Sequence, residues 1–102
     1  ATSAAAAGVA IPADYKVSVT NASGKDAWPI ASFTYLLVHQ DAKDKVKGEE
    51  LVKFLWWAIH DGQATAAPLE YAPLPGPVVK MLEKTIQDLK VQGKPVPVAA
   101  AK

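Results

Sequence analysis

The sequence predicts an α/β fold with few strands and two main helices, and three stretches carry that prediction. Residues 30–38 form an apolar and aromatic run of the kind that suits a buried strand. Residues 47–60, and a second stretch that ends near Leu89, carry apolar residues at helical spacing. Half of the residues are hydrophobic and 21% are charged, as in globular chains. A length of 102 residues indicates one domain or part of one.

Composition excludes several classes of function. The formal net charge of +1 gives no case for nucleic acid or a membrane surface as partner. No apolar run approaches the roughly 18 residues of a membrane span. Cysteine is absent, which excludes disulfides and thiolate zinc sites. All 11 basic residues are Lys, so the chain lacks the Arg fork that anion sites commonly use. We expect no cofactor.

The N-terminal residues predict short elements. Residues 2–7 favour a short helix ended by Gly8 over a signal peptide, because a basic region and a strong apolar core are both lacking. Residues 16–20 alternate polar and apolar and predict a short half-buried strand. Residues 21–24 (NASG) are typical of a turn.

Residues 30–38 are predicted to be a central strand. Pro29 fixes its own φ and donates no N–H, so the strand should begin there. Both faces of the run are mostly apolar, which favours a strand covered on both sides. Such a strand needs neighbours, and this short chain supplies few of them.

Two helices follow. In the helix of residues 47–60, five apolar residues share the predicted buried face: Leu51, Phe54, Leu55, Ala58 and Ile59. Val52 and the pair Trp56-Trp57 widen this surface, so the helix should be covered on more than one side. Prolines then break the chain before a last helix that begins near Pro75–Pro77. Its predicted buried face consists of Val78, Leu82, Ile86 and Leu89. Residues 94–102 are predicted to form a loose tail.

Polar pairs offer weak candidates for catalytic or metal sites. His60 and Asp61 could be an acid–base pair, but adjacent helical residues point in different directions, so we favour a helix-end histidine. His39 and Asp41 lack the third group that a metal site or a triad requires. Adjacent carboxylates at Glu49-Glu50 are interpreted as a solvated first turn. Because no convergent polar site is found, we expect no enzymatic activity.

Two further stretches have a functional and a structural interpretation. Trp56-Trp57 could be a stacking platform, but their position in a strongly apolar helix favours packing. Residues 21–24 with Lys25 could suggest an anion loop. No glycine-rich phosphate fingerprint is present, so a hairpin or hinge turn is favoured.

Four blocks of sequence carry a resemblance to a known family. They are residues 26–38 (DAWPIASFTYLLV), 51–63 (LVKFLWWAIHDGQ), 69–75 (LEYAPLP) and, after the closing helix, 93–95 (GKP). In order and spacing they resemble the C-terminal part of periplasmic phosphate-binding proteins, the substrate receptors of phosphate ABC importers. The resemblance covers roughly residues 15–95. Members of that family are much longer, with two lobes and phosphate in the cleft between them.

The resemblance implies part of a lobe of a type II periplasmic-binding-protein fold. Residues 1–26 would end the second lobe, and residues 27–31 would cross between lobes. Residues 32–93 would be the C-terminal part of the first lobe, and 94–102 the loose tail. The implied hinge consists of Ala27, Trp28, Pro29 and Ile30. A periplasmic or extracellular location and the permease of an ABC importer as partner are implied too.

The resemblance implies no ligand-binding residue in this chain. The family holds the anion with backbone N–H groups, hydroxyls, an Arg and an Asp in parts of its sequence that precede this segment. We therefore expect lobe core and hinge, with inorganic phosphate bound only together with the N-terminal remainder, in the same or a separate chain. The alternative is an assembly module that self-associates or completes a partner chain without binding phosphate. In either case the exposed apolar surface predicts an obligate partner.

Overall fold

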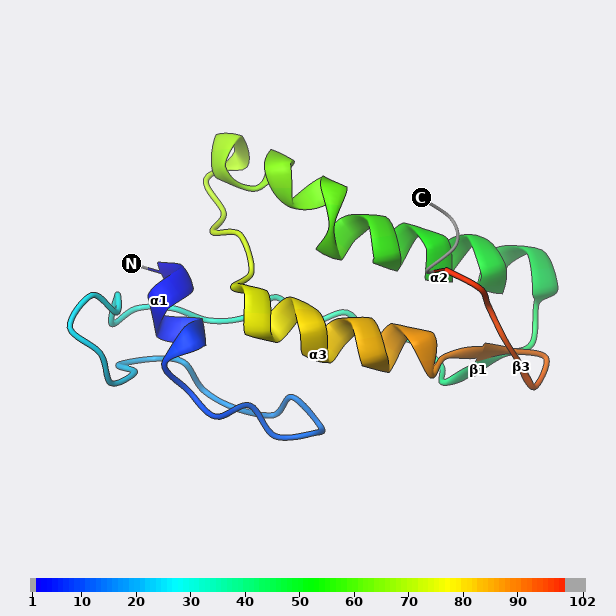
Figure 1. The fold of residues 1–102 in the computed structure, drawn as a ribbon, viewed down its shortest axis with the longest axis horizontal. Helices are drawn as coiled ribbons and strands as arrows, with labels where there is room; N and C mark the ends of the chain where they lie inside the picture. Colours follow the sequence, from blue (N-terminus) through cyan, green and yellow to red (C-terminus); the bar gives the residue numbers. More distant parts are fainter. Residues whose placement is uncertain (1, 99–102) are drawn as a thin grey trace.

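The computed structural model describes residues 2–98 as an α/β fold with two main helices and a three-stranded sheet, which confirms the predicted class. The elements are α1 (Thr2–Ala7), β1 (Asp41–Ala42), α2 (Lys45–Ile59), the 3₁₀ helices η1 (Asp61–Thr65) and η2 (Ala67–Leu69), α3 (Gly76–Gln87), β2 (Lys90–Val91) and β3 (Lys94–Pro95). Helices α2 and α3 lie side by side, and the N-terminal third runs along one flank of this pair (Figure 1). None of the helices within residues 2–98 is both long and apolar enough to span a bilayer.

The sheet is small and lies at one end of the helix pair. Its strand order is β1-β2-β3. Strand β1 pairs with β2 in parallel, with Asp41 opposite Lys90, and β2 pairs with β3 antiparallel. Gly93 takes a φ of 76° in the turn between β2 and β3, a conformation that glycine adopts without strain. Because β1 stands first in the strand order and pairs only with β2, it is an edge of the sheet.

Helix α2 begins two residues earlier than predicted, because Asp44 caps it. The Asp44 side chain accepts a hydrogen bond from the Lys47 N–H at 2.9 Å. Glu49 and Glu50 were predicted to lie in the first turn, but because the helix begins earlier they lie beyond it.

The predicted buried face of α2 was partly wrong. Its buried residues are Gly48, Val52, Leu55 and Ile59, whereas Leu51 and Phe54 are 41% and 53% exposed. A Cβ on Gly48 would lie 2.8 Å from the Ala42 Cβ and 2.9 Å from a Val91 methyl group. Close contact with the sheet at Gly48 therefore decides which side of the helix turns inward.

The main core lies between α2, α3 and the C-terminal strands. It consists of Val52, Leu55, Ile59, Ile86, Leu89, Val91, Val96 and Val98. The predicted face of α3 is confirmed, since Val78, Ile86 and Leu89 are buried and Leu82 packs against the core. The loose tail was wrong for residues 94–98: β3 pairs there, and Val98 is only 1% exposed. Residues 99–102 of that prediction lie outside the described residues.

The N-terminal part has a second, smaller cluster of buried residues: Ala5, Val19 and Ala31. Helix α1 ends at Ala7 as predicted, and the Gly8 N–H donates to the Ala4 carbonyl at 3.0 Å. The predicted turn is confirmed by positive φ values of 52° at Asn21 and 137° at Gly24.

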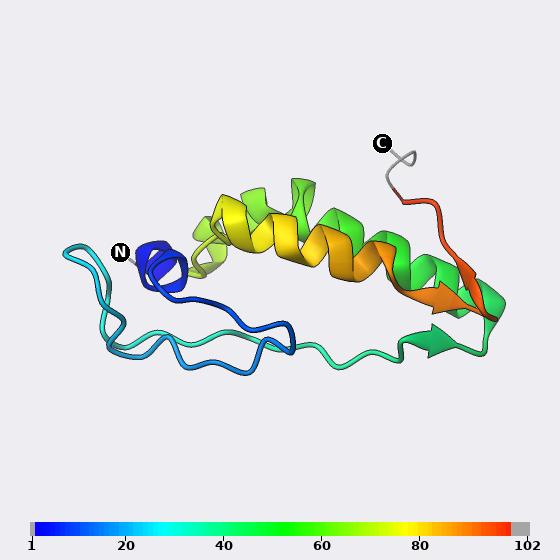
Figure 2. The same ribbon diagram turned by 60° about the horizontal axis from the view of Figure 1, so that its bottom comes forward.

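Two predicted strands are wrong. Residues 16–20 and 30–38 pair with no strand among the described residues, and Figure 2 shows the second stretch as a long trace beside the helices. A strand forms only where a neighbouring backbone completes its hydrogen bonds, and here the ladder begins at Asp41. The expected cover on both faces is also wrong, since Ile30 is 79% exposed and Leu37 98%.

Candidate functional site

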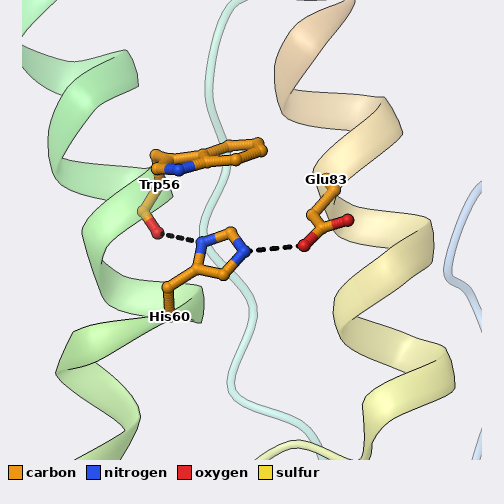
Figure 3. A network of polar contacts seen from close by, with 3 residues as sticks. All are labelled: Trp56, His60 and Glu83. Atoms are coloured by element: carbon orange, nitrogen blue, oxygen red, sulfur yellow. Dashed lines mark hydrogen bonds and ion pairs between the residues drawn. The ribbon is translucent and has the colours of Figure 1, made fainter. Parts of the chain in front are cut away.

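A network of polar contacts joins α2 and α3 where α2 ends (Figure 3). His60 is the C-cap residue of α2. Its Nδ1 atom lies 2.8 Å from the Trp56 carbonyl oxygen, and its Nε2 atom lies 2.7 Å from Oε1 of Glu83 in α3. A carbonyl and a carboxylate oxygen both accept hydrogen bonds, so the doubly protonated ring matches both contacts. The network is a charge-assisted bridge between the two helices.

The surroundings of His60 favour its charged form. The hydrogen bond to Glu83 raises the pKa of His60 above its ordinary value of 6.5, burial opposes this, and the Trp56 carbonyl and the Asp61 charge raise it further. The Trp56 ring also lies against the imidazole, with ring centroids 4.5 Å apart. The side chains of His60 and Glu83 are 29% and 35% exposed. The arrangement is suited to holding two helices together.

Sequence reasoning missed this pair. It weighed His60 against its neighbour Asp61, whereas the partner is Glu83, which lies outside the predicted buried face of α3. The helix-end position of His60 is confirmed. An acidic residue on the facing helix was the available signal, but no spacing rule identifies which one.

The other polar candidates are separated. Asp41 accepts a hydrogen bond from the Gly93 N–H at 2.9 Å, while His39 is exposed. Glu50 lies 3.6 Å from Lys53 on the surface of α2. In the part of the chain that the structure describes, no three acidic or His side chains gather as a metal site would require.

The two tryptophans have different environments. Trp56 packs against the main core, as predicted. Trp57 is 47% exposed, and its ring lies 5.8 Å from that of Phe54 on the outer side of α2. The cover expected on a second side of this helix is therefore absent among residues 2–98.

The predicted hinge residues lie at a bend that follows a turn. The chain bends at Pro29 and Ile30, and the Pro29 carbonyl accepts a hydrogen bond from the Asn21 N–H at 2.7 Å. Trp28 is 51% exposed, and Ala27 packs against the small N-terminal cluster. Residues 21–25 form the turn that precedes this bend. A hinge role for residues 27–30 stays a prediction.

The feature that stands out most is the stretch of residues 31–39. We call it the open strand because the sequence predicted a strand there, although it pairs with no strand within residues 2–98. Its exposed apolar side chains include Leu36 at 65%, Leu37 at 98% and Val38 at 37%. Within residues 2–98, no backbone–backbone hydrogen bond involves residues 32–39. Tyr35 anchors the middle of the stretch, because its hydroxyl donates to the Tyr15 carbonyl at 2.9 Å.

Comparison with known proteins gives one consistent result. The chain is 36% identical over 70 residues to the phosphate-binding protein PstS of Xylella fastidiosa (strain 9a5c). The matched residues make up 69% of this chain and 19% of that protein. It is 30% identical over 67 residues to PstS of Pasteurella multocida. Here the matched residues make up 66% of this chain and 20% of that protein. No family model and no solved structure matches the chain. The matched region spans about a fifth of these curated relatives, and the predicted resemblance to phosphate-binding proteins is confirmed.

Proposed function

We propose that this chain is the C-terminal segment of a phosphate-binding receptor for ABC-type phosphate uptake, and that it supplies lobe core and hinge rather than ligand contacts. The similarity to PstS over 70 residues, limited to about a fifth of the relative's length, carries the proposal. A type II periplasmic-binding-protein fold, a periplasmic or extracellular location and an ABC permease as partner come from the same similarity.

The character of the segment supports a structural role. Phosphate sites in proteins gather several charge-assisted donors around the anion. Here the bridge formed by His60 and Glu83 already uses both ring nitrogens, and its carboxylate would repel an anion. The main core is made of eight aliphatic side chains. Phosphate would therefore be bound only when the N-terminal remainder of the receptor is present.

The hinge belongs to the same proposal. Closure of two lobes needs a few residues between them that absorb the change in backbone dihedral angles. Residues 27–30 suit this role because they lie at a bend, and because one backbone hydrogen bond from Asn21 is the contact that holds Pro29.

A second candidate function is an assembly module without phosphate binding. It is favoured by the amount of exposed apolar surface: besides the open strand, Val46 is 72% exposed, and Phe54 and Trp57 are about half exposed. Patches of this kind mark protein–protein contacts. The module would associate with copies of itself or complete a different partner chain.

Intact-mass native mass spectrometry combined with phosphate titration calorimetry tests the proposal. We expect the segment to occur within, or bound to, a longer polypeptide, and phosphate to bind that assembly but not the segment alone. Multiples of this chain alone would favour the assembly module. Stoichiometric phosphate binding by the segment alone would contradict the structural role.

A further inference from the structure

We infer that Tyr15 is a latch between the two lobes: its hydroxyl is bonded to Thr85 of α3, and this contact holds the lobes together around phosphate. The inference rests on the proposed function, because it takes residues 1–26 as the end of the second lobe and residues 32–93 as part of the first. In this division, Tyr15 and Thr85 lie in different lobes, with the hinge at residues 27–30 between them along the chain.

Two hydrogen bonds hold Tyr15 from opposite ends. Its hydroxyl lies 2.5 Å from Oγ1 of Thr85, and that Oγ1 donates to the Met81 carbonyl at 3.2 Å. Because the Thr85 proton is used there, the Tyr15 hydroxyl is the donor to Thr85. The Tyr15 carbonyl in turn accepts a hydrogen bond from the Tyr35 hydroxyl at 2.9 Å. Thr85 and Tyr35 both belong to the first lobe in this division, so that lobe engages Tyr15 through its side chain and its backbone.

The backbone of Tyr15 is in an unfavourable conformation. Its φ is 59°, in the left-handed region that bulky residues rarely adopt. A turn leads into this conformation, since the Tyr15 N–H donates to the Pro12 carbonyl at 2.9 Å. The next N–H, that of Lys16, donates to the Asp14 side chain at 3.0 Å. Such conformations persist where surrounding contacts compensate for their cost. The bond to Thr85 is one of these contacts, so the turn presents the Tyr15 hydroxyl to α3.

The latch lies outside the main core. That core takes no side chain from residues 2–26. The bond between Tyr15 and Thr85 is exposed to solvent, so it can break and form again without opening the core. A contact of this kind suits two bodies that move relative to each other, because its loss leaves no buried polar group without a partner.

The position of the latch indicates which arrangement of the lobes it favours. Figure 2 shows the loop after α1, which contains Tyr15, on the other side of α1 from the bend at residues 27–30. When lobes separate about a hinge, contacts made away from the hinge are lost. A contact that exists in one arrangement stabilises that arrangement, so the latch should strengthen phosphate binding between the lobes.

A double-mutant cycle in this chain alone tests whether the latch exists. Tyr15→Phe removes the donor, and Thr85→Val removes the acceptor while keeping the shape of the side chain. Each should raise the equilibrium constant of unfolding in urea about two- to fivefold, because an exposed hydrogen bond competes with water. The double variant should raise it no further than the larger single effect. Tyr71→Phe is the matched control at 67% exposure and should change nothing.

Phosphate titration calorimetry of a chimera tests the role between lobes. The chimera is the X. fastidiosa receptor with its corresponding segment replaced by residues 9–98 of this chain. Tyr15→Phe and Thr85→Val should each weaken phosphate binding about two- to fivefold, and the double variant should weaken it no further. Tyr71→Phe should leave the affinity unchanged. Lost stability alone would not give this pattern, because a weakened receptor that is still folded keeps its affinity.

The outcomes separate the latch from the receptor role. Additive effects of the two variants in this chain alone would overturn the latch, whatever the chimera binds. Phosphate affinity that neither variant changes would overturn the latch and spare the receptor role. Tighter binding by the variants would mean that the contact favours separated lobes, which also overturns the inference. A chimera that binds no phosphate would count against the receptor role, and the latch would fall with it.

Discussion

Residues 2–40 and residues 41–98 both contain long apolar stretches, yet they bury them very differently. In the second region, α2, α3 and the C-terminal strands enclose a core of eight aliphatic side chains. In the first, the buried side chains are Ala5, Val19 and Ala31, while the most apolar stretch faces solvent.

The difference lies in whether a second layer is at hand. Helices α2 and α3 each provide the surface that the other needs, and residues 60–75, which include η1 and η2, join them. Residues 30–38 are as apolar as either helix, but a strand requires a hydrogen-bonded neighbour as well as cover. Apolar character therefore predicts that a segment will be buried, but it does not identify the segment that will cover it.

The largest expected effect comes from removing core volume in residues 41–98, which we call the closed region. Ile86→Ala, at 4% exposure, should lower the free energy of unfolding by about 2–5 kcal/mol, because it leaves a cavity against α2. The matched change Leu37→Ala in the open strand should stay within about 0.5 kcal/mol. Urea unfolding followed by circular dichroism measures both. Equal losses would mean that the open strand is packed in solution.

A second test concerns the contact between α2 and the sheet. Gly48→Ala should destabilise the fold by about 1–3 kcal/mol, because its Cβ would lie within 3 Å of Ala42 and Val91. This outweighs the helix preference of Ala over Gly, about 1 kcal/mol. Gly76 in α3 is the control, since nothing lies within 4 Å of a Cβ there, and Gly76→Ala should be neutral or slightly stabilising. A stabilised Gly48→Ala variant would show that α2 stands further from the sheet.

The cap of α2 marks where the closed region begins. Asp44→Ala should cost about 1 kcal/mol by leaving the Lys47 N–H without its partner, and Asp44→Ser should restore most of this. Thermal unfolding measures the loss. Exchange at residues 32–39 should not respond to either variant, and a response there would mean that the two regions are coupled.

The smallest effect is a pH dependence of the closed region. The pKa of His60 is raised in the folded chain, so its bridge to Glu83 contributes fully below about pH 6.5 and is lost as the pH rises through the folded-state pKa. The loss should be about 1 kcal/mol or less, because both side chains are about one-third exposed. Glu83→Gln should lower the pKa of His60 in an NMR titration and flatten the stability between pH 6 and pH 8.5. An unchanged pKa in that variant would remove Glu83 as the cause.

Local patterns predicted the helices and little of what depends on distant partners. Helices α2 and α3 were predictable because helical periodicity is a local property. The inward face of α2 was not, because it depends on the contact of Gly48 with Val91. Burial of Val98 was hidden by a composition that suggested a loose tail.

The candidate site was less predictable than the fold. The partner of His60 lies on another helix, and no sequence spacing encodes a pair that tertiary packing brings together. The open strand was recognised by its residues but wrongly expected to be paired, because no strand among residues 2–98 lies beside it to complete its hydrogen bonds. The hinge at residues 27–30 remains a prediction from resemblance.

The parallel pairing of β1 with β2 has a consequence for the order of folding. Asp41 and Lys90 are distant along the chain, whereas only residues 60–75 separate α2 from α3. Closing a long loop costs more entropy than closing a short one, and helical hairpins form on much shorter timescales than non-local strand pairs. The pair of helices α2 and α3 should therefore form first, and β2, which follows α3 directly, is then in place for β1 to pair with. Residues 40–42 attach afterwards, so β1 is the last strand to join the sheet.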